Sequence, residues 1–597
     1  NVKTIGNSAF YACTELTSAT IPDGVTSVGE RAFYNCTGLT SVVIGKNVKT
    51  IGNSAFCACI ELTSVTIPDG VTSIGERAFY NCTGLTSVVI GKNVKTIGNS
   101  AFCACIELTS VTIPDGVTSI GERAFYNCTG LTSVVIGKNV KTIGGSAFEG
   151  CTELTEIIIP DSVTSIDGSA FSGCSMLERV SIGNCITSIG GDAFSVCDKL
   201  KYNEYDNAYY LGCDENPYVV LMESKDKSIT SCAINEKTKV IYDSAFQNCT
   251  KLTSVSIPDT VTSIGYEAFG DCKGLTSVTI GSDVTSIGGN AFIGCQKLVE
   301  VINNSGLNIT KGSWANGEVA YYALSVKKGG VTDVVNKDRY LFYPYYSVNY
   351  LLGYVGNDTE LTLLENYNGQ NYEIYKYAFY ACKELTSMTI PDCVTSIGYE
   401  AFCGCARLTS VTIGSDVTSI GGNAFSGCNK LVEVINNSSL NITKGSEDNG
   451  DVGYYALSVK KGGTTDIVNK NGYLFITVDK VNYLFEYAGN DAELMLPQNY
   501  NGANYQIHNY AFRSCRLLTS VVIPDGVASI GEMAFFWCNR LKSITIPDSV
   551  TSIGGEAFRY CTSLETIYYK GTEEQWNAIA KGRLWKYDID CAIVYNA

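Results

Sequence analysis

The chain of 597 residues has a single histidine, His508, and this scarcity argues against most hydrolytic and zinc-dependent chemistry. Catalytic triads and zinc proteases need a histidine with partners at defined spacings, and the residues around His508 supply none of them. Neither a serine nucleophile elbow nor a phosphate-binding glycine loop occurs. Tyr375 stands at the equivalent place in an earlier copy of the same stretch, so we interpret His508 as an exposed filler. The sequence predicts no enzyme.

An excess of positive charge is also lacking. Lys and Arg number 43 against 59 Asp and Glu, which gives a net charge of -16. Nucleic acids and anionic membrane surfaces attract basic patches, so we expect neither as a partner. No apolar run approaches the roughly 18 residues that span a bilayer, and we expect no membrane insertion. The chain opens in mid-repeat at Asn1 without a signal peptide, and we expect an N-terminal part with its own cap to precede it.

What the chain has in abundance is one repeat. An Ala-Phe pair occurs eighteen times, and within each block successive Phe residues keep a constant 23-residue period. The Phe residues are Phe10, Phe33, Phe56, Phe79, Phe102, Phe125, Phe148, Phe171, Phe194, Phe246, Phe269, Phe292, Phe379, Phe402, Phe425, Phe512, Phe535 and Phe558. A fixed period of about 20 to 30 residues is typical of stacked units that bury their apolar faces against one another. The chain is therefore predicted to be a repeat solenoid.

Each repeat predicts two short strands and two turns. Leu85-x-x-Val88-x-Ile90 has the spacing of a strand whose inward residues line a solenoid. A Pro-Asp or Gly-Lys turn follows, and then a second extended piece of the form Val-x-x-Ile-Gly. We expect a turn of α- or 3₁₀-helix at Ala-Phe-x-x-Cys, with Phe and Cys facing inward.

Cysteine is the residue that most invites a chemical interpretation. Eighteen of the 26 lie three positions after a repeat Phe, so stacking predicts one column of small, buried, reduced thiols. The pairs Cys57-x-Cys59 and Cys403-x-Cys405 suggest metal, but no fixed four-ligand pattern accompanies them. We therefore predict no metal site and no cofactor.

Where the 23-residue period is interrupted, the sequence predicts insertions and a cap. The expected organisation is 1–200 regular repeats, 201–228 inserted hairpin, 229–302 repeats, 303–360 Tyr-rich β insertion, 361–435 repeats, 436–493 Tyr-rich β insertion, 494–564 repeats and 565–597 C-terminal cap. The two long insertions are near-copies, and their alternating aromatics predict hairpins or a small sheet protruding from the solenoid. In the cap, Thr572 to Gln575 has the form of a capping box. Trp576, Ile579 and Leu584 are expected to face inward, and Cys591 to Tyr595 to form a final strand.

The insertions also hold the candidate ligand-binding residues. Tyr and Trp offer contact area with one polar end, which suits sugar or protein recognition. The candidates are Trp314, Tyr321, Tyr322, Tyr343, Tyr345, Tyr346, Tyr454, Tyr455, Tyr473 and Phe475. The alternative is that these rings pack each hairpin onto the solenoid, since hairpins need aromatic cross-strand pairs. On the regular strands the outward Ser64 and Thr66 are ascribed to β-propensity and solvation, because the turns lack the aromatic and Arg anchors of a hot spot.

The repeat resembles a known family. Leu62-Thr63-Ser64-Val65-Thr66-Ile67-Pro68-Asp69-Gly70-Val71-Thr72-Ser73-Ile74-Gly75, followed by Ala78-Phe79 and Cys82, is similar to the BspA-like leucine-rich repeat of bacterial and protozoan surface proteins. The resemblance implies a leucine-rich-repeat solenoid, a right-handed superhelix of short parallel β-strands with short helical or 3₁₀ turns. It also implies an extracellular or cell-surface location, and it brings no catalytic residues.

Together these features predict a non-enzymatic surface protein that mediates adhesion. Its expected partner is an extracellular protein or glycan on a host or neighbouring cell, and a monomer is expected. Repeated weak contacts along a solenoid give avidity without a deep pocket. The alternative is a passive spacer or stalk in a larger surface protein, which the near-identity of 24–69 and 70–115 favours because duplication adds length.

Overall fold

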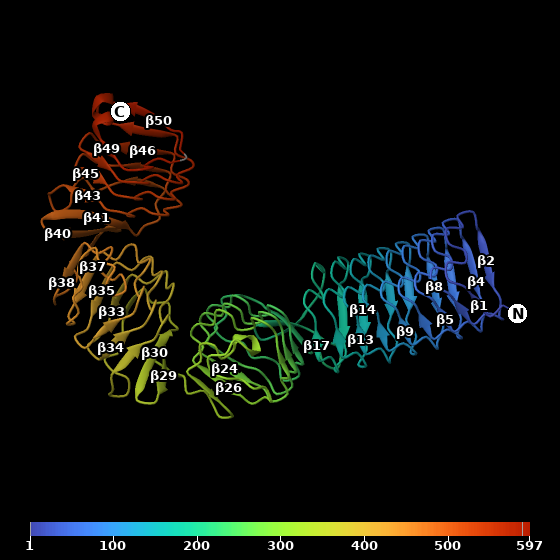
Figure 1. Cartoon of the computed structure of the whole chain (residues 1–597). Helices are drawn as coiled ribbons and strands as arrows, with labels where there is room; N and C mark the ends of the chain where they lie inside the picture. Colours follow the sequence, from blue (N-terminus) through green and yellow to red (C-terminus); the bar gives the residue numbers. More distant parts are fainter. Residues whose placement is uncertain (1, 588, 597) are drawn as a thin grey trace. The chain divides into compact units, whose positions relative to one another are not determined.

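The computed structural model describes residues 2–587 and 589–596 and divides the chain into two compact units, Asn1–Asp333 and Val334–Ala597. In each unit the backbone winds into stacked turns, and corresponding strands of successive turns pair in parallel (Figure 1). The predicted solenoid is confirmed. Within the described residues, no helix combines the length and the apolarity needed to cross a bilayer.

The first unit opens with a block of regular turns in which each turn adds a strand to two sheets. One sheet is built from β1 (Thr4–Ile5), β3 (Ser27–Val28), β5 (Thr50–Ile51), β7 (Ser73–Ile74), β9 (Thr96–Ile97), β11 (Ser119–Ile120), β13 (Thr142–Ile143), β15 (Ser165–Ile166) and β17 (Ser188–Ile189). The other side holds β2 (Ser18–Ile21), β4 (Ser41–Ile44), β6 (Ser64–Ile67), β8 (Ser87–Ile90), β10 (Ser110–Thr112) and β12 (Ser133–Val135), then β14 (Glu156–Ile159) with β16 (Arg179–Ile182). Each residue pairs with its counterpart in the next repeat, as Ser64 does with Ser87.

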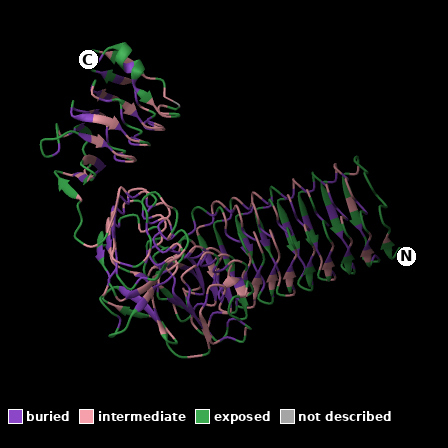
Figure 2. Ribbon diagram, turned by 60° about the vertical axis from the view of Figure 1, so that its left-hand side comes forward, coloured by how far each residue is buried: buried purple, intermediate pink, exposed green. Residues whose placement is uncertain are grey.

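Alternation along the strands fixes this register. Val65 and Ile67 of β6 are buried, whereas Ser64 and Thr66 are exposed. A slip of one residue would carry the apolar pair to the solvent side, so the period of the sequence becomes the period of the stack. Figure 2 shows buried and exposed residues side by side in the turns of this block.

The Ala-Phe-x-x-Cys segment is a succession of tight turns, and the expected helical turn is wrong. Arg77 and Asn81, which flank Ala78-Phe79, have φ of 54° and 56°. A right-handed helix does not pass through left-handed residues at this spacing. The Phe79 N–H instead donates to the Ala101 carbonyl of the next turn, at 2.7 Å. Such bonds between turns alternate with local bonds along the chain, as the Tyr80 N–H donates to the Arg77 carbonyl at 3.1 Å.

Two columns of side chains run through the inside of the turns. Phe79 stacks on Phe102 with ring centroids 5.2 Å apart and planes 3° from parallel. The Cys82 thiol donates to the Phe56 carbonyl of the preceding turn, at 3.2 Å. Fourteen column cysteines make this same bond, so Cys is both a small apolar filler and the donor that satisfies a buried carbonyl. The predicted column is confirmed in position, although its first member, Cys13, is exposed.

The second block of the first unit begins with a hairpin. Antiparallel β18 (Asn203–Tyr205), β19 (Ala208–Leu211) and β20 (Val220–Ser224) lead into parallel β21 (Val240–Ile241), β23 (Ser263–Ile264) and β25 (Ser286–Ile287). The companion sheet is β22 (Ser254–Ser256), β24 (Ser277–Ile280), β26 (Glu300–Asn303) and β27 (Ser325–Lys327), with a 3₁₀ segment, η1, at Asn316–Glu318.

The second unit contains two further blocks of this design. The first has β28 (Val335–Lys337), β29 (Tyr340–Tyr345), β30 (Val348–Tyr354), β32 (Tyr372–Ile374), β34 (Val394–Ile397) and β36 (Ser419–Ile420), beside β31 (Glu360–Thr362), β33 (Ser387–Thr389), β35 (Ser410–Ile413), β37 (Glu433–Asn436) and β38 (Ser458–Lys460). The last has β39 (Val468–Lys470), β40 (Tyr473–Val478), β41 (Val481–Tyr487), β43 (Tyr505–Ile507), β45 (Val527–Ile530), β47 (Ser552–Ile553) and β49 (Ala580–Lys581), beside β42 (Glu493–Met495), β44 (Ser520–Val522), β46 (Ser543–Ile546), β48 (Thr566–Tyr569) and β50 (Ala592–Tyr595).

The Tyr-rich insertions are parts of the solenoid, and the expectation that they protrude from it is wrong. The stretch between β26 and β27 is a longer turn, because Glu300 pairs with Ser325 in parallel and the Phe292 N–H donates to the Gly317 carbonyl. The hairpin β28–β30 then supplies the first strand of the next block, since Leu351 pairs in parallel with Ile374 of the following turn. The second insertion repeats both features.

Each hairpin contributes apolar side chains to the block that follows it, and Ile476 and Phe485 of the second hairpin also pack against Val432 of the preceding block. Phe342 and Leu351 belong to a core that extends to Ala456, whereas Phe475 and Leu484 belong to a separate core that extends to Ile579. A solenoid end needs cover for its apolar interior, and the hairpins provide that cover within the chain.

The C-terminal stretch contains a short helix that begins with the predicted capping box. Thr572 caps α1 (Glu573–Ala578), and its side chain and that of Gln575 form the predicted capping box. Trp576 and Ile579 are buried against the last core, but Leu584 is 37% exposed and does not face inward as expected. The strand predicted to begin at Cys591 is β50, paired in parallel with β48.

Candidate functional site

The ten predicted aromatic residues divide by burial into three sets. Trp314, Tyr346 and Tyr454 are exposed, by 65%, 92% and 44% respectively. Tyr321, Tyr322, Tyr345 and Tyr455 are half-buried, and Tyr343, Tyr473 and Phe475 are buried. Trp314, Tyr321 and Tyr322 lie in the first unit and the other seven lie in the second.

The buried members of the set pack the hairpins. Phe475 is fully buried, with its ring centroid 4.4 Å from that of Tyr500 and 5.3 Å from that of Tyr505. In the preceding copy Phe342 has the same neighbours, with Tyr367 at 4.3 Å and Tyr372 at 5.3 Å. The prediction that Tyr343, Tyr473 and Phe475 contact a ligand is therefore wrong, because these rings are buried and a ligand cannot reach them.

Two of the three exposed members differ between the two copies of the insertion. Trp314 corresponds to Glu447 and Tyr346 to Asp479, whereas the exposed Tyr454 corresponds to Tyr321 and the buried Phe342 to Phe475. Trp314 rests on Tyr321 with ring centroids 4.0 Å apart, and Tyr346, beyond the end of β29, meets Tyr345 at 4.5 Å. The rings of Trp314 and Tyr346 are exposed and are not repeated, so they are available for binding.

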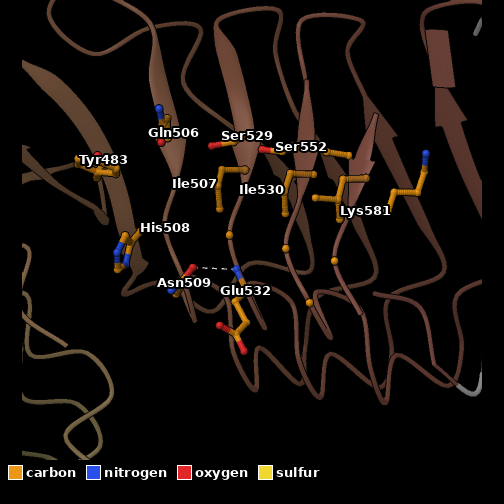
Figure 3. Close-up of a pocket in the computed structure, with 16 residues that line it drawn as sticks. Tyr483, Gln506, Ile507, His508, Asn509, Ser529, Ile530, Glu532, Ser552 and Lys581 are labelled. Atoms are coloured by element: carbon orange, nitrogen blue, oxygen red, sulfur yellow. Dashed lines mark hydrogen bonds between the residues drawn. The ribbon is translucent and has the colours of Figure 1, made fainter. Parts of the chain in front are cut away.

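A shallow groove lies over the strands of the last block and holds a volume of about 540 Å³ (Figure 3). It runs across β41, β43, β45, β47 and β49. Its polar lining is Tyr483, Gln506, His508, Asn509, Ser529, Glu532, Ser552 and Lys581. Amides and hydroxyls that recur from turn to turn can hydrogen-bond a neutral polar chain lying along the groove.

His508 forms part of the groove wall and is half-buried, so its interpretation as an exposed filler is wrong. The Tyr483 ring meets it edge to face at 5.7 Å. Burial lowers the pKa of His508 to about 4, because the interior disfavours the imidazolium. The imidazole is neutral near pH 7. At the groove floor the Glu532 N–H donates to Asn509 Oδ1 at 2.8 Å, in the same way that turns are linked elsewhere.

No group of three or more His, Cys, Asp and Glu side chains is placed to hold a metal ion within residues 2–587 and 589–596. Most column cysteines are buried, whereas Cys13 is exposed and Cys382 and Cys515 are half-buried. The pKa of Cys59 is raised to about 12, chiefly by desolvation, so its thiolate does not form near neutral pH.

A sequence profile described as the BspA type leucine rich repeat region matches residues 1–109, 95–211, 224–324, 366–446 and 482–581. These ranges cover most of the chain. The chain belongs to the BspA-type leucine-rich-repeat family. The resemblance seen in the repeat is thereby confirmed, and such repeat proteins are in general non-enzymatic.

Three of the solved structures that are similar to this BspA-type chain are bacterial proteins. A leucine-rich repeat protein from Bacteroides ovatus is 20% identical and matches over 95% of this chain and 88% of its own, with a TM-score of 0.29. A leucine rich cell surface protein from Faecalibacterium prausnitzii is 27% identical over 82% and 86%, with a TM-score of 0.22. The pneumococcal vaccine antigen PcpA is 17% identical over 55% and 85%, at 0.30. The low TM-scores carry no argument, and the comparison with curated proteins gave no match.

The BspA-type turns of the last block carry a surface that our interpretation of the repeat missed. We expected the regular turns to lack aromatic and Arg anchors, but Arg513, Phe536, Trp537, Arg559 and Tyr560 lie on adjacent turns there. The amino-acid composition of this part of the chain indicates such a surface. Five of the eleven Arg and three of the four Trp lie between residues 513 and 585.

Proposed function

We propose that the chain is a non-enzymatic binding protein of a cell surface that mediates adhesion to an extracellular protein or glycan. The observation that carries the proposal is the contrast between the two insertion copies. The packed ring of Phe342 is kept as Phe475, while the exposed Trp314 and Tyr346 are replaced by Glu447 and Asp479. Exposed Trp and Tyr are the residue types that anchor protein and sugar contacts.

Other features support binding over catalysis. Inside the turns, the Phe and Cys columns are occupied by stacking and by hydrogen bonds between turns. The groove of the last block is shallow and polar, a form suited to an extended ligand. Several weak contacts spread over a repeat array raise overall affinity without a deep pocket.

The alternative function is that of a spacer, and one observation favours it. Residues 24–69 and 70–115 differ only at Val28 and Ile74, so this part of the chain adds length without adding a new surface. A spacer has no ligand of its own.

Point substitutions test the proposal better than deletion, because removing an insertion also removes core residues such as Phe475. Trp314→Ala and Tyr346→Ala, singly and together, should lower binding to arrayed glycans or extracellular matrix proteins about tenfold, which corresponds to the loss of one aromatic anchor. Tyr80→Ala is the matched control, since Tyr80 is exposed on a regular turn.

The outcomes separate the two functions. Binding that survives in the double variant refutes the role of the insertion aromatics. If the unaltered chain binds nothing on either array, the spacer is the better account. An equal loss of binding in Tyr80→Ala would show that any exposed aromatic ring contributes to binding. The difference between the two insertion copies would then not support the proposal.

A further inference from the structure

The last block carries a cluster of arginine side chains on an acidic chain. Residues 468–595 contain eleven Lys or Arg and thirteen Asp or Glu, and five of the eleven Arg of the chain lie in this block. Arg513 is half-buried, and Arg516 and Arg540 are exposed. These side chains project from turns rather than from the strands of the groove, so this surface is distinct from the groove.

Two guanidinium groups of this surface, those of Arg513 and Arg516, lack carboxylate partners among the described residues. In the first block, Arg31, Arg77 and Arg123 each lie within 4 Å of the neighbouring Glu, with N–O distances of 3.8, 3.8 and 3.9 Å. Among the described residues, Arg513 and Arg516 form no ion pair and lie against rings instead. Arg513 Cζ is 5.5 Å from the centroids of both Tyr510 and Phe536, and Arg516 Cζ is 5.9 Å from that of Trp537. A guanidinium held on a ring keeps its N–H groups for an anion.

The neighbouring turn extends the pattern. Arg559 lies between Tyr560 and Tyr587, with Cζ 4.8 and 5.3 Å from the ring centroids, and its Nη1 donates to Glu556 at 3.0 Å. Its Nε is buried and has no hydrogen-bond partner in the described part of the chain. Trp537 is 46% exposed beside these groups.

The turns hold these side chains in line. The Ser514 N–H donates to the Phe536 carbonyl at 2.8 Å, and the Trp537 N–H donates to the Arg559 carbonyl at 3.0 Å. Residues 513, 536 and 559 therefore form one column and residues 514, 537 and 560 the next, with a step of about 4.8 Å between turns. Charge and aromatic faces recur along a line.

We propose that the surface formed by Arg513, Arg516, Phe536, Trp537, Arg559 and Tyr560 binds an acidic polysaccharide. The guanidinium forks pair with carboxylate or sulfate groups, and the exposed ring of Trp537 stacks on the apolar face of a sugar. A repeating polyanion presents such groups at regular intervals, which matches a column of side chains better than an irregular folded surface does.

An acidic peptide fits this surface less well. An extended peptide gains affinity by pairing its backbone with a free strand edge. Here the backbone N–H groups of Ser514 and Trp537 already bond the next turn, so only side chains remain to make contacts. This proposal goes beyond the adhesion proposed above and does not depend on Trp314 or Tyr346.

The test is binding of the whole chain to heparin, which is sulfated, and to polygalacturonate, which is carboxylated. Neutral dextran, polyglutamate and single-stranded oligothymidylate serve as comparisons. Arg513→Gln with Arg516→Gln should weaken binding to the preferred polysaccharide at least about tenfold, since each lost charge-assisted bond costs a substantial part of that factor. Arg31→Gln with Arg77→Gln removes the same charge elsewhere and should change the affinity less than about twofold.

Trp537→Ala separates stacking from charge, because it leaves the net charge unaltered. We expect it to weaken polysaccharide binding at least about fivefold while leaving the weak binding of polyglutamate unchanged. Trp314→Ala with Tyr346→Ala should leave heparin and polygalacturonate binding unchanged, which keeps this test independent of the adhesion test. Melting curves for each variant check that the last block remains folded.

Several results would overturn the proposal. Equal losses in the Arg31/Arg77 control would mean that net charge alone governs binding. Polyglutamate or oligothymidylate bound as tightly as the polysaccharides would point to an acidic peptide or a nucleic acid. Absence of binding to both polysaccharides at low ionic strength, where charge attraction is strongest, would remove the site altogether.

Discussion

Phe475→Ala should unfold the last block early and should not act as the loss of a ligand contact. Phe475 is fully buried between Tyr500 and Tyr505, with ring centroids 4.4 and 5.3 Å away. Replacing a buried Phe by Ala costs about 3 to 5 kcal/mol, from lost burial and the cavity left behind. With a urea dependence of about 2 kcal/mol per molar, the unfolding midpoint should fall by about 2 M.

Tryptophan fluorescence reports on this block selectively. Trp537, Trp576 and Trp585 lie in the last block, and only Trp314 lies elsewhere. The matched control is Phe342→Ala, which removes the equivalent ring from a separate core that contains no Trp. That variant should lose stability by circular dichroism and leave the fluorescence transition of the last block nearly unchanged.

An unchanged fluorescence midpoint in Phe475→Ala would refute the assignment of the hairpin to the downstream core. A shift of the same transition by Phe342→Ala, of similar size, would refute the independence of the two cores.

Two predictions concern pH. Burial raises the pKa of the Cys59 and Cys128 thiols from 9.0 to about 12, so these thiols lose their protons at lower pH in the unfolded chain than in the folded chain. Their contribution to stability should therefore be full below pH 9 and lost as the pH rises toward 12. Between about pH 7 and 10.5, the urea midpoint of the variant Cys59→Ala with Cys128→Ala should fall less steeply than that of the unaltered chain. Burial lowers the pKa of His508 from 6.5 to about 4, so the contribution of His508 to stability should be full above pH 6.5 and lost as the pH falls toward 4. His508→Tyr, which introduces the residue found at Tyr375, should remove that acid dependence from the urea midpoint measured by fluorescence. An unaltered dependence in the variant would contradict the prediction.

The repeat itself was predictable because its determinants are local. The Val65 and Ile67 alternation, the constant step between Phe residues and the capping box at Thr572 each report on close neighbours in the sequence, or on a copy of the same turn. The conformation of Ala78-Phe79 was not predictable in this way. Apolar spacing there resembles a helical turn, but hydrogen bonds to the next turn select left-handed residues at Arg77 and Asn81.

The candidate site was less predictable, because burial of an aromatic depends on which element covers it. Alternation predicts that Tyr473 to Val478 is a strand, yet it does not say that the hairpin it forms joins the sheet of the following block. His508 looked exposed because the covering Tyr483 belongs to β41, an earlier strand of the sheet. The two insertion copies distinguish Phe475 from Tyr346, since Phe342 is repeated as Phe475 whereas Tyr346 is replaced by Asp479.

The hairpins β28–β30 and β39–β41 have a consequence for how such a chain changes length. Each hairpin covers the apolar end of the block that follows it, and Ile476 and Phe485 of the second hairpin also pack back against Val432 of the preceding block. Because the long unit is repeated, addition or removal of one whole copy leaves each remaining block next to a hairpin of the same kind. Removal of part of a copy, by contrast, exposes a core.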